Sequence, residues 1–374
     1  MTRIFIALLL LVSLAVFLPG AVFAADKDVE RVYDWVKSLQ LENGLLESSD
    51  DSNFVSLYEN ALAAVVFSAR GDFKRAEKIF DFFVRDMDEL QEYPGGFGQF
   101  RDRYGVPLNG VPHRWLGDNA WLLIAINNYH NLAENNRYAG LSSALEGWMR
   151  SLQDPQDGGL WGGYEQSGKR IHKVTEGIID AFNAVNGCDD FHKKILSFLK
   201  AGYWDPQKKV FIAWKGHKKY QYALDLHSWG YCALPDMPAQ ILDGAAMHVT
   251  TKKATVNGRE VTGFCFDIDC DTIWLEGTGE MVVAFQSAGK DPEADFYIAQ
   301  LEKMITPSPK NPAFAGIPYA TNPGTGYATG VLWDGVDKNL SLTSSAWYLL
   351  GKLKYDPMAI GRKKNIPAAD IFWK

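Results

Sequence analysis

Carboxylate side chains stand beside tryptophans at several widely separated places in the sequence, a combination that suits work on sugars. A pair of carboxyl groups can hydrolyse a glycosidic bond, because one protonates the leaving oxygen while the other activates water or attacks carbon. Separations of about 6.5–9.5 Å imply inversion, and about 5–5.5 Å imply retention. The candidate catalytic residues are Asp118, Glu176, Asp225, Glu276 and Glu280.

Asp118 lies three residues from both Trp115 and Trp121 in the sequence. A carboxylate at a helix N-terminus also caps free backbone amides and is stabilised by the helix dipole, so a purely structural role is the alternative. The two indoles make a poor setting for a solvent-exposed cap and favour a substrate cleft. Glu176 stands just before an apolar run and has two similar interpretations. It is either a structural acidic residue in the first turn of a helix or a carboxyl group that points into the cleft beside Asp118.

Glu276 and Glu280 are four residues apart, so on a helix they share one face. In a closed cleft their repulsion raises the pKa of one carboxyl group and produces a general acid beside a charged partner. Asp225 stands two residues before His227. The histidine is either a satisfied core residue, the commoner outcome, or a group that binds a sugar hydroxyl or shuttles a proton.

Aromatic residues make up 13% of the chain and include 12 tryptophans. Because a pyranose face is apolar enough to lie on an indole, tryptophans beside the acids are natural sugar-binding residues. The candidate substrate-binding residues are Tyr58, Arg114, Trp115, Trp121, Trp161, His227, Trp229, Trp274 and Tyr319.

The elements that must position these residues recur along the chain. Six apolar, helix-like runs open with polar or acidic clusters at intervals of roughly 50 to 70 residues. A second helical segment accompanies most of them, so the expected unit is a helical hairpin, and six hairpins closed into a ring would bring the polar openings to one end. The expected inner helices are 58–69, 118–131, 175–185, 223–234, 272–288 and 342–353, and the outer ones 28–39, 73–90, 141–152, 190–200 and 292–304.

Two departures from the helical period are expected. A short strand-like pair lies in 203–214, and alternating residues around Asn257-Gly258 predict a β-hairpin within 249–266, inserted on the rim of the ring. We find no linker or break in composition. The predicted organisation is therefore a signal peptide at 1–24 and a single all-α domain at 25–374.

The N-terminal segment has a basic start, an apolar stretch from Ile4 to Leu18 and small residues ending at Ala24. This order is typical of a secretory signal peptide, and a transmembrane anchor is the less favoured alternative. The expected location is periplasmic or secreted, without a membrane anchor after cleavage. The net charge of −7 and the sequence pI of about 5.6 do not suit a nucleic-acid partner.

Metal and cofactor motifs are weak. Asp267, Asp269 and Asp271 resemble the start of a calcium loop, but threonines occupy its turn-glycine and final-glutamate positions, which excludes an EF-hand and leaves only a weaker calcium site as an alternative. Paired CxxC spacing for zinc and a phosphate loop are both missing from the sequence, so we expect no metal and no cofactor. Cys265 and Cys270 could close a small loop, and Cys188 with Cys232 could pair between neighbouring hairpins.

The helix openings at Asp118, Glu176, Trp274-Leu275-Glu276-Gly277 and Ser344-Ser345-Ala346-Trp347 resemble those of the six-hairpin glycosidase superfamily. The resemblance covers most of the mature chain and implies an (α/α)6 toroid. Such proteins are mostly glycoside hydrolases, with some polysaccharide lyases and sugar epimerases. By this resemblance, acidic residues at the inner-helix openings would be the acid and the base.

Three functions follow as hypotheses. The first is an exported glycoside hydrolase acting on an oligo- or polysaccharide. The second is a lyase or epimerase on the same ring, with a basic cluster, Arg101, Arg103, His113 and Arg114, available to bind an acidic sugar. The third is a polysaccharide-binding or export-assembly protein without catalysis. The sequence leaves the sugar, its linkage and the oligomeric state open.

Overall fold

The computed structural model describes residues 26–108, 113–216, 220–267, 269–325 and 334–374. The predicted signal peptide falls outside these ranges. Among the described residues, no helix combines the length and the apolar character needed to cross a bilayer.

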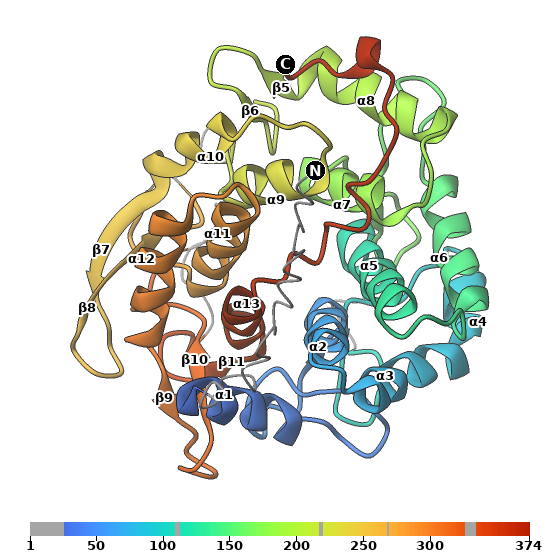
Figure 1. Cartoon of the computed structure of the whole chain (residues 1–374). Coiled ribbons are helices and arrows are strands. Elements are labelled where there is room, and N and C mark those ends of the chain that lie inside the picture. Colours follow the sequence, from blue (N-terminus) through green and yellow to red (C-terminus); the bar gives the residue numbers. More distant parts are fainter. Residues whose placement is uncertain (1–25, 109–112, 217–219, 268, 326–333) are drawn as a thin grey trace, which may run out of the picture.

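Six inner helices form a closed ring around a common axis (Figure 1). Each packs against the next in chain order, and the last packs against the first, so the circle closes. This arrangement confirms the predicted all-α toroid. Within the described residues, the inner helices are α2 (Leu57–Ala69), α5 (Leu116–Leu132), α7 (Thr175–Ala184), α9 (Asp225–Ala233), α11 (Leu275–Ser287) and α13 (Leu342–Leu353).

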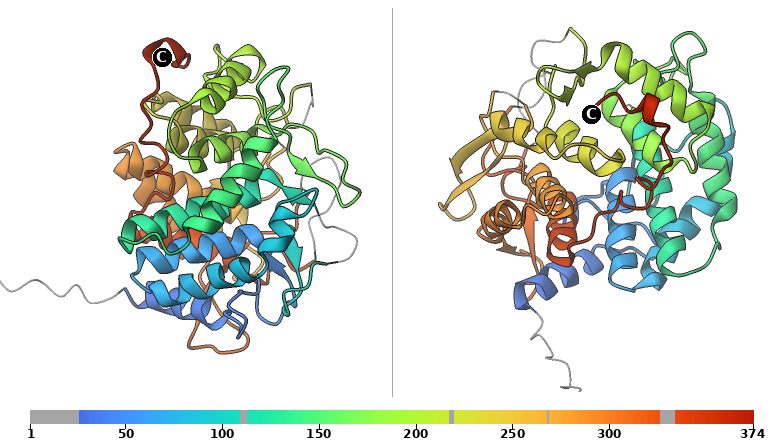
Figure 2. Two further views of the ribbon diagram at one scale, coloured as in Figure 1. Left: turned by 90° about the vertical axis from the view of Figure 1, so that its right-hand side faces the viewer. Right: turned by 45° about the horizontal axis from the view of Figure 1, so that its top comes forward.

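A second layer of helices surrounds the inner ring (Figures 1 and 2). Most outer helices pack against the inner helix that precedes them in the chain, whereas the first outer helix, α1, packs against the last inner helix, α13. The first helix of the chain and the last inner helix are therefore neighbours in the ring. The outer layer comprises α1 (Lys27–Ser38), α3 (Phe73–Arg85) with its continuation α4 (Met87–Gln91), α6 (Ala139–Ser151), α8 (Asp190–Gly202), the short α10 (Gln240–Asp243) with a 3₁₀ turn at Gly244–His248, and α12 (Asp291–Glu302).

The inner and outer helices differ in their pattern of buried residues, as the periodicity of apolar residues in the sequence predicts. The outer helix α3 buries Ala76, Ile79, Phe80 and Phe83, which form one stripe at helical spacing. The inner helix α2 is buried without interruption from Asn60 to Ser68, because helices cover it on both sides. The continuous apolar runs in the sequence are thus the inner layer.

Short strands lead the chain into the inner helices. β1 and β11 run directly into α2 and α13, where Ser56 and Ser341 accept hydrogen bonds from the amides of Glu59 and Ser344 and so cap the two helices. Of these short pairs, the sequence predicted only the one within 203–214. The antiparallel pairs are β1 (Val55–Ser56) with β2 (Phe100–Arg101), β3 (Arg114–Trp115) with β4 (Gly163–Tyr164), β5 (Trp204–Asp205) with β6 (Val210–Phe211), and β10 (Ala315–Pro318) with both β9 (Thr306–Pro307) and β11 (Leu340–Ser341).

The predicted β-hairpin is present as β7 (Val249–Lys253) and β8 (Glu260–Phe264), with a register that runs from Val249 opposite Phe264 to Lys253 opposite Glu260. It packs against α12 at the outside of the ring rather than on the rim (Figure 1). Just after it, Cys265 and Cys270 form a disulfide. Cys188 and Cys232 are not bonded to each other and remain free thiols.

The C-terminal segment crosses one end of the ring (Figure 1). Asn128, near the end of α5, donates to the carbonyl oxygen of Pro357 at 2.8 Å, and Asn183, at the end of α7, donates to that of Met358 at 3.0 Å. Further along, Trp373 is also buried. The segment therefore covers the C-terminal ends of the inner helices, whose N-terminal ends lie at the opposite face.

Candidate active site

A cavity of about 1030 Å³ lies at the N-terminal ends of the inner helices. All six inner helices contribute residues from their first two turns, as the hairpin arrangement requires. Residues from different helices meet here although they are far apart in the sequence. Among the described residues that line the cavity there is no lysine or arginine.

Six carboxyl groups of the described residues face this cavity. Four of them, Asp118, Glu176, Asp225 and Glu276, are predicted catalytic residues, each from a different inner helix. Sequence reasoning missed the other two, Glu59 and Asp180. Both carried a usable signal, because Glu59 belongs to the polar opening of the first inner helix and Asp180 stands four residues after Glu176, on the same helix face.

Burial raises the pKa of all six carboxyl groups, because a low-dielectric site disfavours their charged form. The pKa of Asp118, of Glu176 and of Glu276 is raised to about 7, and that of Glu59 to about 8. For Asp180 and Asp225, burial and then the charges of neighbouring carboxylates hold the pKa well above its usual range. The values for Asp118, Glu176, Glu276 and Glu59 place their proton exchange near neutral pH.

Glu176 and Glu276 have different surroundings. The Glu276 carboxylate accepts hydrogen bonds from the side chains of Tyr58 and Thr343, which oppose the effect of burial and favour its charged form. Glu176 has only its own backbone amide to oppose burial, and its Oε2 has no hydrogen-bond partner among the described residues. The surroundings of Glu276 therefore offer more hydrogen bonds to a charged carboxylate than those of Glu176, although the pKa of each is raised to about 7.

Rings of Tyr58, Trp121 and Trp229 line the cavity, and Trp347 packs against Trp121 without lining it. The Trp121 ring centroid lies 5.6 Å from that of Trp229, 5.7 Å from that of Trp347 and 5.4 Å from that of Tyr58. The indole N–H of Trp347 donates to the Tyr58 hydroxyl oxygen at 3.1 Å, which aligns the group that contacts Glu276. Trp347 belongs to the predicted opening motif of the sixth inner helix but was not among the predicted binding residues.

Of the predicted substrate-binding residues, six line the cavity: Tyr58, Trp115, Trp121, Trp229, Trp274 and Tyr319. The rim adds a pair that the sequence did not single out. Trp214, 43% exposed, stacks on His172 with ring centroids 4.7 Å apart. A pair of stacked rings at the mouth offers a further flat surface to a sugar.

Four predicted site residues do not line the cavity. The Arg114 guanidinium donates to the backbone carbonyls of Glu89 and Gly96. The Nζ atom of Lys173 lies 4.8 Å from the centroid of the Trp161 ring.

His227 and Glu280 lie deeper in the protein. His227 is fully buried and donates through Nδ1 to the carbonyl oxygen of Ile241 at 2.7 Å, which is the core role weighed above. Glu280 is 1% exposed, one turn below Glu276, and accepts a hydrogen bond from Ser228 at 3.1 Å.

The basic cluster before the second inner helix is engaged elsewhere. Arg101 is buried against Glu89 and Asp86, and Arg103 forms an ion pair with Glu47 at 2.9 Å. Neither these two arginines nor Arg114 lines the cavity. They are therefore not placed to bind an acidic sugar there.

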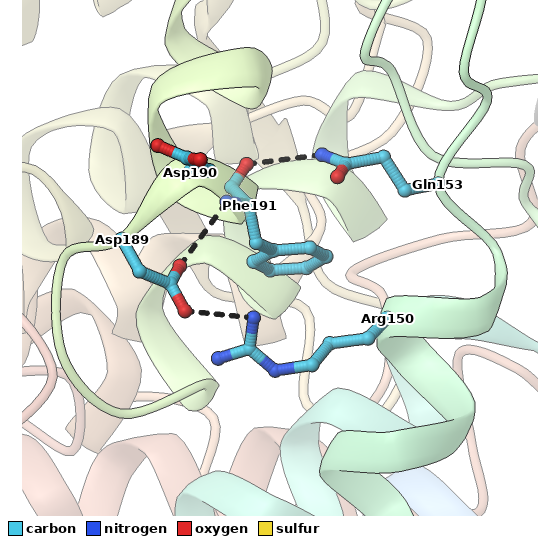
Figure 3. Close-up of a pocket in the computed structure, with 5 residues that line it drawn as sticks. All are labelled: Arg150, Gln153, Asp189, Asp190 and Phe191. Carbon is cyan, nitrogen blue, oxygen red and sulfur yellow. Dashed lines mark hydrogen bonds and ion pairs between the residues drawn. The ribbon is translucent and has the colours of Figure 1, made fainter.

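A separate surface pocket lies between α6 and α8 (Figure 3). Its polar groups bind one another. Arg150 pairs with Asp189 at 2.9 Å, Gln153 donates to the carbonyl oxygen of Phe191 at 3.0 Å, and Asp189 accepts from the Phe191 amide at 3.1 Å. These contacts hold the two outer helices together and leave the ring cavity as the candidate active site.

Gly277 is required for the position of a cavity tryptophan. A Cβ atom at this position would overlap the Trp274 ring and lie 2.8 Å from Leu224 Cδ2. We expect Gly277→Ala to displace Trp274 and to lower stability by about 1–3 kcal/mol. Gly147→Ala is the control, because a Cβ there meets nothing within 4 Å and alanine favours the helix. Urea unfolding curves check the expectation, and a variant as stable as the wild type would contradict it.

No protein-family profile and no curated protein sequence matches the chain. Solved structures do match it. A glycosidase has a TM-score of 0.59 at 12% identity, with 90% of this chain and 99% of that chain covered. A sugar epimerase from a ruminal bacterium has a TM-score of 0.59 at 11% identity, covering 87% and 97%. An alpha-amylase from Clostridium perfringens has a TM-score of 0.57 at 12% identity, covering 88% and 97%. These likenesses confirm the expected fold, an (α/α)6 toroid.

Proposed function

We propose that the protein is a glycoside hydrolase that cleaves an oligo- or polysaccharide at the mouth of the helical ring. One observation carries the proposal. Carboxyl groups from different inner helices, with pKa values raised to about 7 or beyond, share a single cavity with aromatic rings. Glycoside hydrolysis needs a protonated and a charged carboxyl group beside a surface that holds a sugar.

In the proposed reaction Glu176 is the general acid and protonates the glycosidic oxygen. Its proton is held near neutral pH because burial raises its pKa to about 7. Glu276 is the second carboxylate, which activates water or attacks the anomeric carbon while Tyr58 and Thr343 stabilise its charge. Asp118 and Asp225 would accept hydrogen bonds from sugar hydroxyls, and the rings of Trp121 and Trp229 would support the sugar.

A sugar epimerase is the second candidate, favoured by the likeness to a sugar epimerase. Epimerisation beside a carbonyl needs a base that removes a proton from carbon. His172 is the one histidine among the described lining residues, and burial lowers its pKa. A lyase acting on uronates is less well supported, since the described lining offers no arginine or lysine to neutralise the acid.

The remaining expectations from the sequence complete the proposal. We propose that residues 1–24 direct export and that the enzyme works in the periplasm or outside the cell. Its partner there would be a carbohydrate rather than a nucleic acid.

The test is a glycan panel with product analysis by mass spectrometry and NMR. A hydrolase produces new reducing ends with the addition of water, and the anomer formed first shows inversion or retention. An epimerase gives a product of unchanged mass, and a lyase gives an unsaturated product that absorbs in the ultraviolet. Binding without any product on prolonged incubation would overturn the proposal in favour of a non-catalytic binding protein.

A further inference from the structure

The bottom of the cavity combines two indole rings with two carboxyl groups, and we call these four residues the cavity floor: Trp121, Asp180, Asp225 and Trp229. Asp225 and Trp229 are four residues apart on α9 and therefore share a face. Asp180, on α7, lies close enough to Trp121 and Asp225 for both to affect its pKa. Three helices thus bring the cavity floor together.

Each residue of the cavity floor has a polar side-chain atom without a hydrogen-bond partner among the described residues, and we consider Asp225 and Trp229. Asp225 is 5% exposed and lines the cavity, yet its Oδ1 has no hydrogen-bond partner among the described residues. The same holds for the indole N–H of Trp229, which is 8% exposed. Buried polar groups are normally hydrogen-bonded, so the Asp225 oxygen points to a donor on a ligand and the Trp229 N–H to an acceptor such as a sugar hydroxyl.

A negative charge on these carboxyl groups would have no protein partner of opposite sign in the described lining, and burial holds their pKa above its usual range. The N-termini of the inner helices offset part of it, but this effect falls off within the first turn. Asp180 is the sixth residue of α7 and lies beyond that turn. Within the described residues, no group of three or more His, Cys, Asp or Glu side chains could hold a metal ion.

We propose that the substrate is a glycan with free, protonated amino groups, one of which binds at the cavity floor. The proposal rests on the proposed function, because it names the class of sugar that enters the active site. An ammonium group donates three hydrogen bonds and is attracted to indole faces, so it matches both the carboxylates and the rings. A neutral sugar brings no positive charge that would favour the ionised form of these carboxyl groups, and a uronate would add a further negative charge beside them.

The first test is calorimetric titration of the full protein with three amino sugars, glucosamine, galactosamine and mannosamine, each compared with glucose, galactose or mannose. At least one amino sugar should bind about tenfold or more tightly than its neutral parent. Its binding should also release protons, since a cation displaces them from the carboxyl groups, and the apparent enthalpy should therefore depend on the buffer. The neutral sugars should release none.

Asp180→Asn should lower the preference for the amino sugar about tenfold and change the affinity for its neutral parent by less than about threefold. Asp190→Asn is the control, because it removes one negative charge from an exposed side chain at the start of α8. Equal affinities for amino and neutral sugars, binding of neither, or binding without proton release would overturn the inference. The wild-type titration decides this even where a variant fails to fold.

The two proposals fail in different ways. Cleavage of neutral oligosaccharides without any preference for amino sugars would overturn the inference and leave the hydrolase proposal intact. Selective binding of an amino sugar, with no glycan cleaved, would overturn the hydrolase proposal and support the cation site at the cavity floor. Preferential cleavage of an oligomer of an amino sugar over its N-acetylated form would support both.

Discussion

Glu176→Gln is expected to reduce the rate of glycan hydrolysis by about 10²–10⁴-fold, the usual contribution of a positioned general acid. Glutamine keeps the shape of the side chain and cannot supply the proton. Glutamine keeps an oxygen that can accept from the residue's own backbone amide, and the Glu176 Oε2 has no hydrogen-bond partner among the described residues to lose. Folding should therefore be preserved, which circular dichroism and the unfolding midpoint would show.

The leaving group separates an acid from a binding residue. With an aryl glycoside whose phenolate leaves without protonation, the loss for Glu176→Gln should shrink to a small factor, because the step no longer needs an acid. Glu276→Gln should remain slow on the same substrate. Glu42→Gln, at an exposed position, is the matched control and should be neutral. An equal loss on both substrates for Glu176→Gln would show that Glu176 is not the acid.

The fold was predictable because each inner helix has two signals in the sequence. Continuous apolar runs mark burial on all sides, and a polar cluster marks each N-terminus, as at Asp118 and Glu176. The short strands were missed except near 203–214. Pairs of two residues, such as Val55–Ser56 with Phe100–Arg101, leave no alternating pattern for the sequence to show.

The site was predictable only in part, for a physical reason. The ring brings helix openings together, so acids at those openings converge whatever their spacing along the chain. Whether a side chain one turn further along reaches the cavity depends on rotation about the helix axis, and here Asp180 lines it while Glu280 does not. Arg114 does not line the cavity for another reason, because its guanidinium donates to the backbone carbonyls of Glu89 and Gly96.

The cavity acids should also make the protein less stable as the pH rises from 6.5 to 8. The pKa of Glu59 is raised by burial from its ordinary 4.5 to about 8. In this interval the unfolded chain has released a proton that the folded chain still holds, so each pH unit lowers the free energy of unfolding by about 1.4 kcal/mol for each such group. Glu176 and Glu276 contribute only up to their pKa of about 7.

Titration of the buried histidines does not change the stability between pH 6.5 and 8. Burial lowers the pKa of His227 and of His248 to about 4, so their stability effect is present above pH 6.5 and is lost only as the pH falls below it. Glu59→Gln removes the titrating group while preserving its volume. The variant should be more stable than the wild type by a few kcal/mol at pH 8 and by much less at pH 5.

Urea unfolding at pH 5, 6.5, 7.25 and 8, extrapolated linearly to water, measures this difference. Glu42→Gln should follow the wild type at every pH, because it changes an exposed carboxyl group. If Glu59→Gln lost stability with pH as steeply as the wild type, the buried carboxyl group of Glu59 would have to be ionised in the folded protein at neutral pH. The described cavity lining has no lysine or arginine to stabilise that charge, so the protonated form is the one consistent with the structure.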